Sequence, residues 1–107
     1  MSKVRRLRDD AVQLADAVRS VDLAALHALI SRGGRCRGED PARFFPEDAH
    51  DAQDPVELCR RCGVRSACLV FALASREEHG VWGGRTEYER AELLDQVDAV
   101  LAREEAA

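Results

Sequence analysis

Aromatic residues and long apolar segments are scarce in this sequence. Phe, Trp and Tyr make up 5% of its 107 residues. No apolar run approaches the roughly 20 residues that a membrane-spanning helix needs, and none follows the basic residues near the N-terminus as a signal peptide would require. Because strands favour aromatic residues, a core of Ala, Leu and Val is more typical of helices. The composition predicts an all-α, cytoplasmic protein that contacts no membrane.

Positive charge is also in short supply. The chain has 16 basic and 20 acidic residues, which gives a net charge of −4. Proteins that hold DNA by themselves neutralise phosphates, so this balance has the wrong sign for general DNA binding. Any contact with nucleic acid would need a local basic patch or a partner. The four basic residues nearest the N-terminus are Lys3, Arg5, Arg6 and Arg8.

Four cysteines stand out against this plain composition. A chain without an export signal is expected to meet a reducing cytosol, where cysteines are more often metal ligands or redox-active thiols than disulfides. A domain of this length buries only a modest share of its unfolded surface, so a metal would help it fold. The four residues are Cys36, Cys59, Cys62 and Cys68.

Apolar periodicity predicts two helices in the first third of the chain. Apolar residues recur at spacings of three and four over residues 4–21, the pattern of an amphipathic helix. Asp22 is a candidate N-cap for a second helix, and Gly33 and Gly34 are expected to end it. The segment 32–53 contains glycines and prolines without an apolar period and is predicted to be an ordered loop.

Two helices are predicted around the later cysteines. Asp54 as N-cap and Pro55 at the first helical position start a helix that is expected to reach about Cys62. Gly63 breaks it, and the next helix is expected to end near Gly80. The apolar face of that next helix is predicted to consist of Ala67, Val70, Phe71 and Ala74.

A turn and a last helix complete the expected elements. The glycine-rich run 80–84 predicts a turn, and Thr86 with Glu89 forms a capping box at the start of the last helix. The polar side of this helix is acidic, because three basic and seven acidic residues follow Gly84. Its apolar stripe is predicted to consist of Leu93, Leu94, Val97, Val100 and Leu101.

The cysteine spacing favours an iron–sulfur cluster over zinc. Cys59 and Cys62 are separated by two residues, which places their sulfurs about one turn apart at a helix end. Cys68 follows at the start of the next helix, and Cys36 comes singly from the loop. Structural zinc usually has two close pairs, whereas the iron corners of a cubane accept ligands from separate elements. Zinc and a redox dithiol stay open as alternatives.

The same cysteine order, followed by the turn Gly80-Val81-Trp82-Gly83-Gly84, resembles the WhiB-like (Wbl) family of actinobacterial iron–sulfur transcription regulators. The loop Phe44-Phe45-Pro46-Glu47 is similar to the family's loop after its first cysteine, and Arg61-Cys62 with Val64-Arg65 fits the segment around its central pair. The resemblance spans residues 36–90.

This resemblance implies a cofactor and a fold. Cys36, Cys59, Cys62 and Cys68 would hold a [4Fe–4S] cluster that responds to nitric oxide or oxygen and makes the protein a redox sensor. The expected fold is a small bundle of four to five helices wrapped around that cluster. The implied division is an N-terminal amphipathic extension over 1–31, a cluster-binding domain over 32–90, and an acidic C-terminal helix over 91–107 that packs on the domain.

The resemblance also implies a partner. Family members bind the C-terminal domain of the principal sigma factor of RNA polymerase, so we expect a monomer or a heterodimer with sigma. Many members carry a basic motif after the turn, but the corresponding region of this chain is acidic. Contact with promoter DNA is therefore expected to be indirect. The residues implied in partner binding are Trp82, Gly80, Val81, Gly83, Gly84, Phe44, Phe45 and Pro46.

Three alternatives stay open from the residues alone. Trp82 is equally consistent with a residue that packs in the core and contacts no partner. A zinc-stapled interaction module would share the fold and the partner surface. A protein disulfide reductase would use the Cys59 and Cys62 thiols, although a thioredoxin-type site follows a strand and no strand is expected before Cys59. We therefore expect a protein that is not an enzyme.

Overall fold

The computed structural model describes residues 11–106, and the expected helix over 4–21 is described only from Ala11 onward. Over this range no strand forms, and the only β-type pairing is a bridge between Trp82 and Arg85. The predicted all-α class is confirmed. None of the described helices combines the length and apolarity needed to cross a bilayer. The helices are α2 (Ala11–Arg19), α3 (Leu23–Gly33), η2 (Pro41–Phe44), η3 (Ala49–Ala52), α4 (Gln53–Arg60), α5 (Arg65–Ala74) and α6 (Glu87–Ala106).

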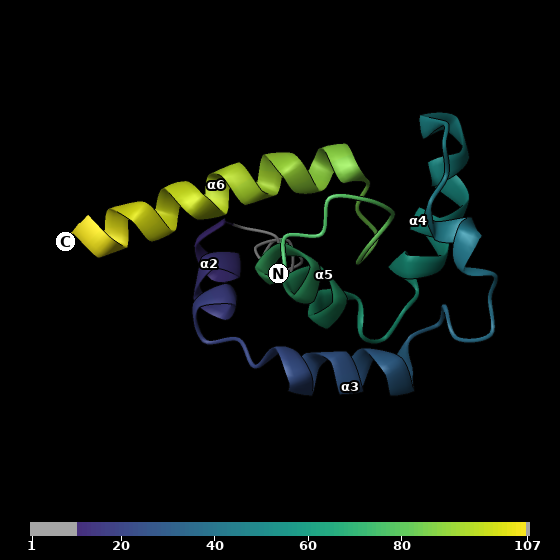
Figure 1. The fold of residues 1–107 in the computed structure, drawn as a ribbon, viewed down its shortest axis with the longest axis horizontal. Helices are drawn as coiled ribbons and strands as arrows, with labels where there is room; N and C mark the ends of the chain where they lie inside the picture. The colour runs from purple at the N-terminus through teal and green to yellow at the C-terminus, as the bar shows by residue number, and fades with distance from the viewer. Residues whose placement is uncertain (1–10, 107) are drawn as a thin grey trace, which may run out of the picture.

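Three helices share the apolar core. Helix α2 packs on both α5 and α6, while α3 covers another side of α5. Figure 1 shows α5 between α6 and α3, with α4 at the end of the molecule opposite the C-terminus. We call the buried cluster between α2, α5 and α6 the helical core. Its members are Leu14, Ala15, Leu69, Leu73, Leu93, Val97 and Val100.

Local signals place several helix ends where the sequence predicts them. The Asp22 carboxylate accepts a hydrogen bond from the Ala25 N–H at 3.0 Å and caps α3. Before α6, the Thr86 N–H donates to the Glu89 carboxylate at 3.0 Å, and the Glu89 N–H donates to the Thr86 hydroxyl at 3.2 Å. This is the predicted capping box, and the predicted apolar stripe of α6 does face the helical core.

The predicted start of α4 is wrong by two residues. The helix begins at Gln53, and its N-cap, Ala52, offers no side-chain hydrogen bond. Asp54 is occupied elsewhere, because both of its carboxylate oxygens accept hydrogen bonds from Arg43 at 2.6 and 2.9 Å. The preceding turn η3 runs directly into α4, so no separate cap is needed.

The predicted end of α5 is also wrong, because the helix stops at Ala74. Arg76 adopts the left-handed conformation with φ +57°. The Glu77 N–H donates to the Ala72 carbonyl at 2.9 Å, and the Arg76 N–H donates to the Leu73 carbonyl at 3.2 Å. These bonds form a Schellman motif, which normally uses glycine and therefore left no sequence signal here.

The apolar face of α5 differs from the prediction for a related reason. Leu69, Ala72 and Leu73 are buried, whereas the predicted residues are only partly buried. Helix α5 has neighbours on several sides, so one stripe does not describe its burial. Phe71, on the predicted face, stacks on Trp82 with the ring centroids 6.0 Å apart and lies 5.8 Å from the His27 ring.

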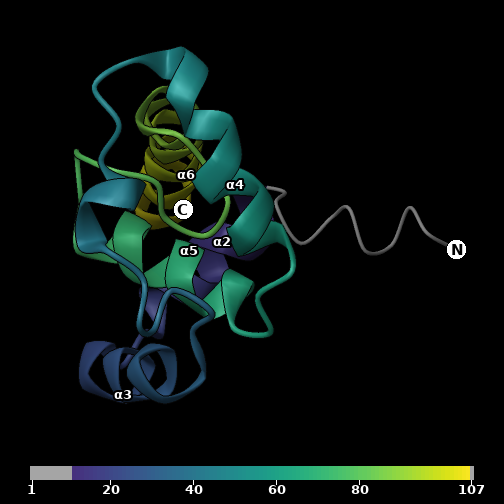
Figure 2. The same ribbon diagram turned by 90° about the vertical axis from the view of Figure 1, so that its right-hand side faces the viewer.

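The predicted loop 32–53 contains two short 3₁₀ helices. Asp40 accepts a hydrogen bond from the Ala42 N–H at the start of η2, and Asp48 accepts one from the His50 N–H at the start of η3. Figure 2 shows this segment beside α4, on the face that Figure 1 turns to the right. The loop therefore wraps the end of the molecule that carries the cysteines.

Candidate metal centre

The structure brings all four cysteines to one cavity. Cys36 lies in the loop after α3, Cys59 in the last turn of α4, Cys62 in the turn that follows, and Cys68 in the first turn of α5. All four are free thiols. The rest of the lining contains no carboxylate, so sulfur is the donor that this cavity offers to a metal. Thiolate ligands select zinc, copper(I) and iron–sulfur clusters rather than magnesium or calcium.

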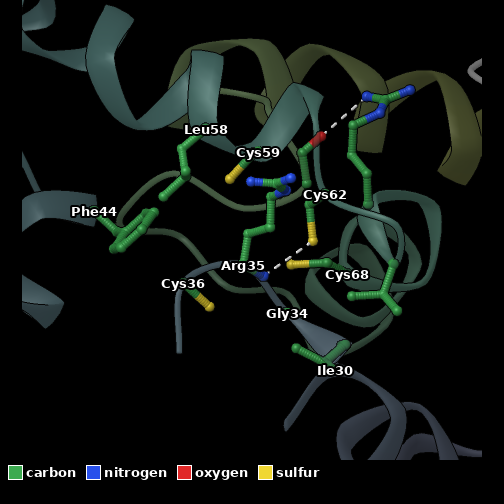
Figure 3. Close-up of a pocket in the computed structure, with 12 residues that line it drawn as sticks. Ile30, Gly34, Arg35, Cys36, Phe44, Leu58, Cys59, Cys62 and Cys68 are labelled. Atoms are coloured by element: carbon green, nitrogen blue, oxygen red, sulfur yellow. Dashed lines mark hydrogen bonds between the residues drawn. The ribbon is translucent and has the colours of Figure 1, made fainter. Parts of the chain in front are cut away.

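The cysteines differ in how deeply they lie. Figure 3 shows the sulfurs of Cys59, Cys62 and Cys68 turned toward a common space, with Cys36 on the loop at its edge. Cys36 is exposed, whereas the other three are partly buried. Three of the cysteines therefore lie at or next to helix ends, and the fourth lies on a surface loop.

Backbone N–H groups point at three of the four sulfurs. The Arg35 N–H donates to Cys62 Sγ at 3.4 Å. Backbone hydrogen bonds from Gly84 to Cys59 and from Gly83 to Cys68 favour the thiolate of each. Such bonds stabilise a negatively charged sulfur and are one of the means by which proteins set the reduction potential of an iron–sulfur cluster.

Burial opposes ionisation of the same thiols. It raises the pKa of Cys59, and it raises the pKa of Cys68 to about 12. Without a metal, both groups therefore hold their protons at neutral pH. A metal binds the thiolate, so its binding must release these protons.

The spread of the sulfurs bears on which metal group fits. Among residues 11–106, no three His, Cys, Asp or Glu side chains are placed to share a single ion. One zinc ion needs its ligands at about 2.3 Å from a common point, whereas a cubane places its iron atoms at four separate corners. Four thiols that line one cavity from separate elements are consistent with a cysteine-bound cluster.

The glycine turn lies directly against this cavity. Trp82 and Arg85 exchange backbone hydrogen bonds of 3.2 and 3.0 Å, and Gly83 and Gly84 between them have φ values of +60° and +75°. These angles belong to a type I′ turn. A Cβ on Gly83 would meet the Leu69 backbone at 2.8 Å, so only glycine permits the turn to lie on α5.

The residues expected to contact a partner divide by exposure. Gly80, Gly83, Gly84, Val81 and Phe44 are buried, so they shape the site from within. Pro46 is partly buried. The exposed aromatic residue of the set is Phe45, with 49% of its surface accessible.

Trp82 lies between the two extremes. It is partly buried, stacks on Phe71, and donates its Nε1–H to the His79 carbonyl at 3.0 Å. Trp82 and Phe45 line the same groove of about 230 Å³, which reaches Cys36, Cys59 and Cys68. The groove therefore connects the exposed aromatic rings with the cysteine site.

Sequence reasoning missed Arg90. This side chain is 3% exposed, and its guanidinium donates to the carbonyls of Gly80 at 2.6 Å and Arg85 at 2.9 Å. Further bonds of 3.3 Å reach Glu77 and His79. Arg90 thus ties the whole loop that carries Trp82 to α6. The available signal was its position, three residues before Leu93 in the register of the apolar stripe.

The structure thus defines a small all-α domain whose four cysteines line one cavity beside a glycine-rich turn. A family model described as "Transcription factor WhiB" matches residues 31–93, and the chain belongs to this family. The predicted resemblance to the WhiB-like family is confirmed.

Several curated relatives support this assignment. The chain is 45% identical over 58 residues to transcriptional regulator WhiB2 of Mycolicibacterium smegmatis, which is 54% of this chain and 45% of that protein. It is 48% identical over 66 residues to WhiD of Streptomyces coelicolor, 55% of this chain and 59% of that protein. With WhiB4 of Mycobacterium tuberculosis it shares 39% over 87 residues, 81% of this chain and 72% of that protein. The chain thus spans about half the length of some relatives it matches.

Proposed function

We propose that this protein is a cytoplasmic [4Fe–4S] transcriptional regulator that responds to redox change or nitric oxide and acts by binding the principal sigma factor of RNA polymerase. The observation that supports this most strongly is that four thiols line one cavity directly under the turn that carries Trp82. The names of the relatives, all transcriptional regulators, agree with the proposed role.

Cys36, Cys59, Cys62 and Cys68 are the proposed cluster ligands. A bound cluster would supply a redox-active centre that reacts with small diatomic gases. The chain's own contribution is to hold three sulfurs at helix ends, to direct N–H groups at them, and to leave Cys36 on the exposed loop. Of the four proposed ligands, Cys36 is the one that is exposed.

Phe45 and Trp82 are the proposed contact residues for the sigma C-terminal domain. Interface energy concentrates in aromatic side chains that fill pockets, and these two rings line an apolar groove. Gly80, another member of the predicted set, allows the Phe45 ring to lie where it does, because a Cβ on Gly80 would clash with that ring. We expect a monomer that forms a heterodimer with sigma.

The proposed division of the chain keeps residues 32–90 as the unit that binds cluster and partner. Segments 1–31 and 91–107 would then support it from outside. In the described part of these segments, α2 packs on α6, which begins at Glu87 and crosses the boundary at residue 90. Arg90, at this boundary, joins α6 to the loop that carries Trp82.

The disulfide reductase alternative gains no support. A thioredoxin-type Cys-x-x-Cys follows a strand, and no strand precedes Cys59 in residues 11–58.

The test is a titration of cluster-loaded protein with the isolated sigma C-terminal domain under anaerobic conditions. Phe45→Ala and Trp82→Ala are each expected to weaken binding by about tenfold or more, the effect of removing a hot-spot aromatic. Tyr88→Ala is the control, because Tyr88 is 74% exposed and lies outside the groove. Unchanged affinity in both groove variants would refute the assigned interface.

A further inference from the structure

Arginines gather around the cysteine site. The segments 32–38 and 60–65 together contain six of the chain's 16 basic residues and none of its 20 acidic ones. The sixth of them, Arg65, turns inward and donates to the Gly83 carbonyl at 3.0 Å. The other five are exposed, and we call them the arginine surface. They are Arg32, Arg35, Arg37, Arg60 and Arg61.

Direct contacts hold the two segments together. The Arg35 Nε–H donates to the Arg61 carbonyl at 3.0 Å, and the Arg35 N–H reaches Cys62 Sγ. Arg37 donates to the Arg32 carbonyl at 2.7 Å. The segments 32–38 and 60–65, joined by contacts between residues 26 positions apart, therefore form one face at the end of the molecule that carries the cysteines.

Little negative charge offsets this face. Arg60 pairs with Glu57 at 3.5 Å, and this is the only ion pair that the five arginines make with another described residue. The nearby carboxylates of Glu39 and Asp54 are already paired with Arg43. The acidic C-terminal end of α6 lies at the opposite end of the molecule from α4 (Figure 1). A protein of net charge −4 thus keeps one positive surface.

The chemistry of this surface selects its partner. Protein interfaces are built on buried aromatic or aliphatic anchors. None of the exposed large apolar residues lies in either segment; those described are Val12, Leu23, Leu29, Phe45 and Tyr88. Binding to a phosphate backbone needs only positive charge and N–H donors, and the planar guanidinium matches a phosphate particularly well.

We propose that the arginine surface binds the phosphate backbone of duplex DNA without reading its sequence. The surface lies beside the cysteine cavity, which Arg35 lines, and apart from the acidic C-terminal helix. The inference rests on the proposed function in one respect, since a regulator docked on sigma would lie near promoter DNA. It supplies the direct DNA contact that the sequence's overall charge does not predict.

The test measures how binding of the cluster-loaded full chain to a labelled mixed-sequence duplex depends on salt between about 50 and 200 mM. In the surface variant Arg32→Gln, Arg60→Gln and Arg61→Gln are combined. The matched control combines Arg19→Gln, Arg76→Gln and Arg103→Gln, which changes the net charge equally at other places. A third variant replaces Arg32, Arg60 and Arg61 with Lys and keeps the charge.

The surface variant is expected to weaken binding about tenfold at low salt and to reduce the slope of log affinity against log salt by about three. The control and the lysine variant should stay within about twofold of the parent. Circular dichroism checks that each variant is folded.

Three results would overturn the proposal. Equal losses in the surface variant and the control would show a net-charge effect only. Faster cluster loss with unchanged DNA binding would mean that the arginines serve the cluster alone. Weaker sigma binding with an unchanged DNA slope would assign the surface to a protein partner. Failure of the proposed function is read separately, from the sigma titration of Phe45→Ala.

Discussion

The two ends of this small protein are held together by different means. The helical core joins α2, α5 and α6 through seven buried apolar residues. In the cysteine end, which we define as residues 34–62, the apolar side chains whose burial the structure describes include three buried ones, Phe44, Ala52 and Pro55. Each buried large apolar side chain contributes about 1.5 to 3 kcal/mol, so apolar burial accounts for the first region but not for the second.

Polar contacts make up part of the difference. In the cysteine end, Arg43 joins Glu39 to Asp54, and Asp40 and Asp48 cap the two 3₁₀ helices. These bonds lie at the surface, where ion pairs contribute little. A metal group held by the four thiols, as proposed above, would supply the stabilisation that apolar burial does not provide at this end.

The largest expected effect comes from removing all four thiols. In the variant with Ser at positions 36, 59, 62 and 68, the cysteine end should lose its protection from hydrogen exchange. Protection around Leu93 and Val97 should persist, because the helical core does not depend on the metal. Exchange measured by mass spectrometry checks this. Full protection of both regions, or equal loss in both, would contradict the proposal that only the cysteine end depends on a bound metal.

A core substitution should have the opposite distribution. Leu73 is 3% exposed in the helical core, so Leu73→Ala should lower the free energy of unfolding by about 2 to 5 kcal/mol with the metal content unchanged. Leu29→Ala, at a residue that is 41% exposed on α3, is the control and should change it by less than about 0.5 kcal/mol. Urea titrations of both variants measure the difference, and similar values would contradict the assigned core.

The smallest of the three effects tests the contact between the regions. Gly83 has φ +60° and lies against the Leu69 backbone, whereas Gly38 has φ +82° and open space around it. Both alanine variants carry the strain of the left-handed conformation. Gly83→Ala must also push the turn off α5, which should cost about 1 to 3 kcal/mol more. Thermal unfolding of the matched pair gives this difference, and equal melting points would show that the turn does not need close contact.

Signals that act over a few residues were readable in the sequence. Asp22 caps α3, Thr86 and Glu89 form the capping box, and Gly83 with Gly84 forms the turn. Each depends on a side chain within three or four positions of its partner. The spacing of the cysteines likewise predicted that they would share one site, and they line one cavity.

Features that leave no local pattern of side chains were not readable. The start of α4 was misplaced because Arg43, 11 residues away, occupies Asp54. The end of α5 was misplaced because Arg76 takes a conformation normally left to glycine. Arg90 escaped notice because its partners are carbonyl groups, which leave no pattern in the side chains. The arginine surface forms only when residues 32–37 meet residues 60–62.

The central claim is that the four thiols hold an iron–sulfur cluster. Its most direct test is strictly anaerobic purification followed by iron, sulfide and zinc analysis and a visible spectrum before and after addition of nitric oxide. We predict about four irons and four sulfides per chain, with a visible chromophore that nitric oxide changes. One zinc per chain, without sulfide or colour, would contradict the claim and leave a zinc-stabilised interaction module in its place.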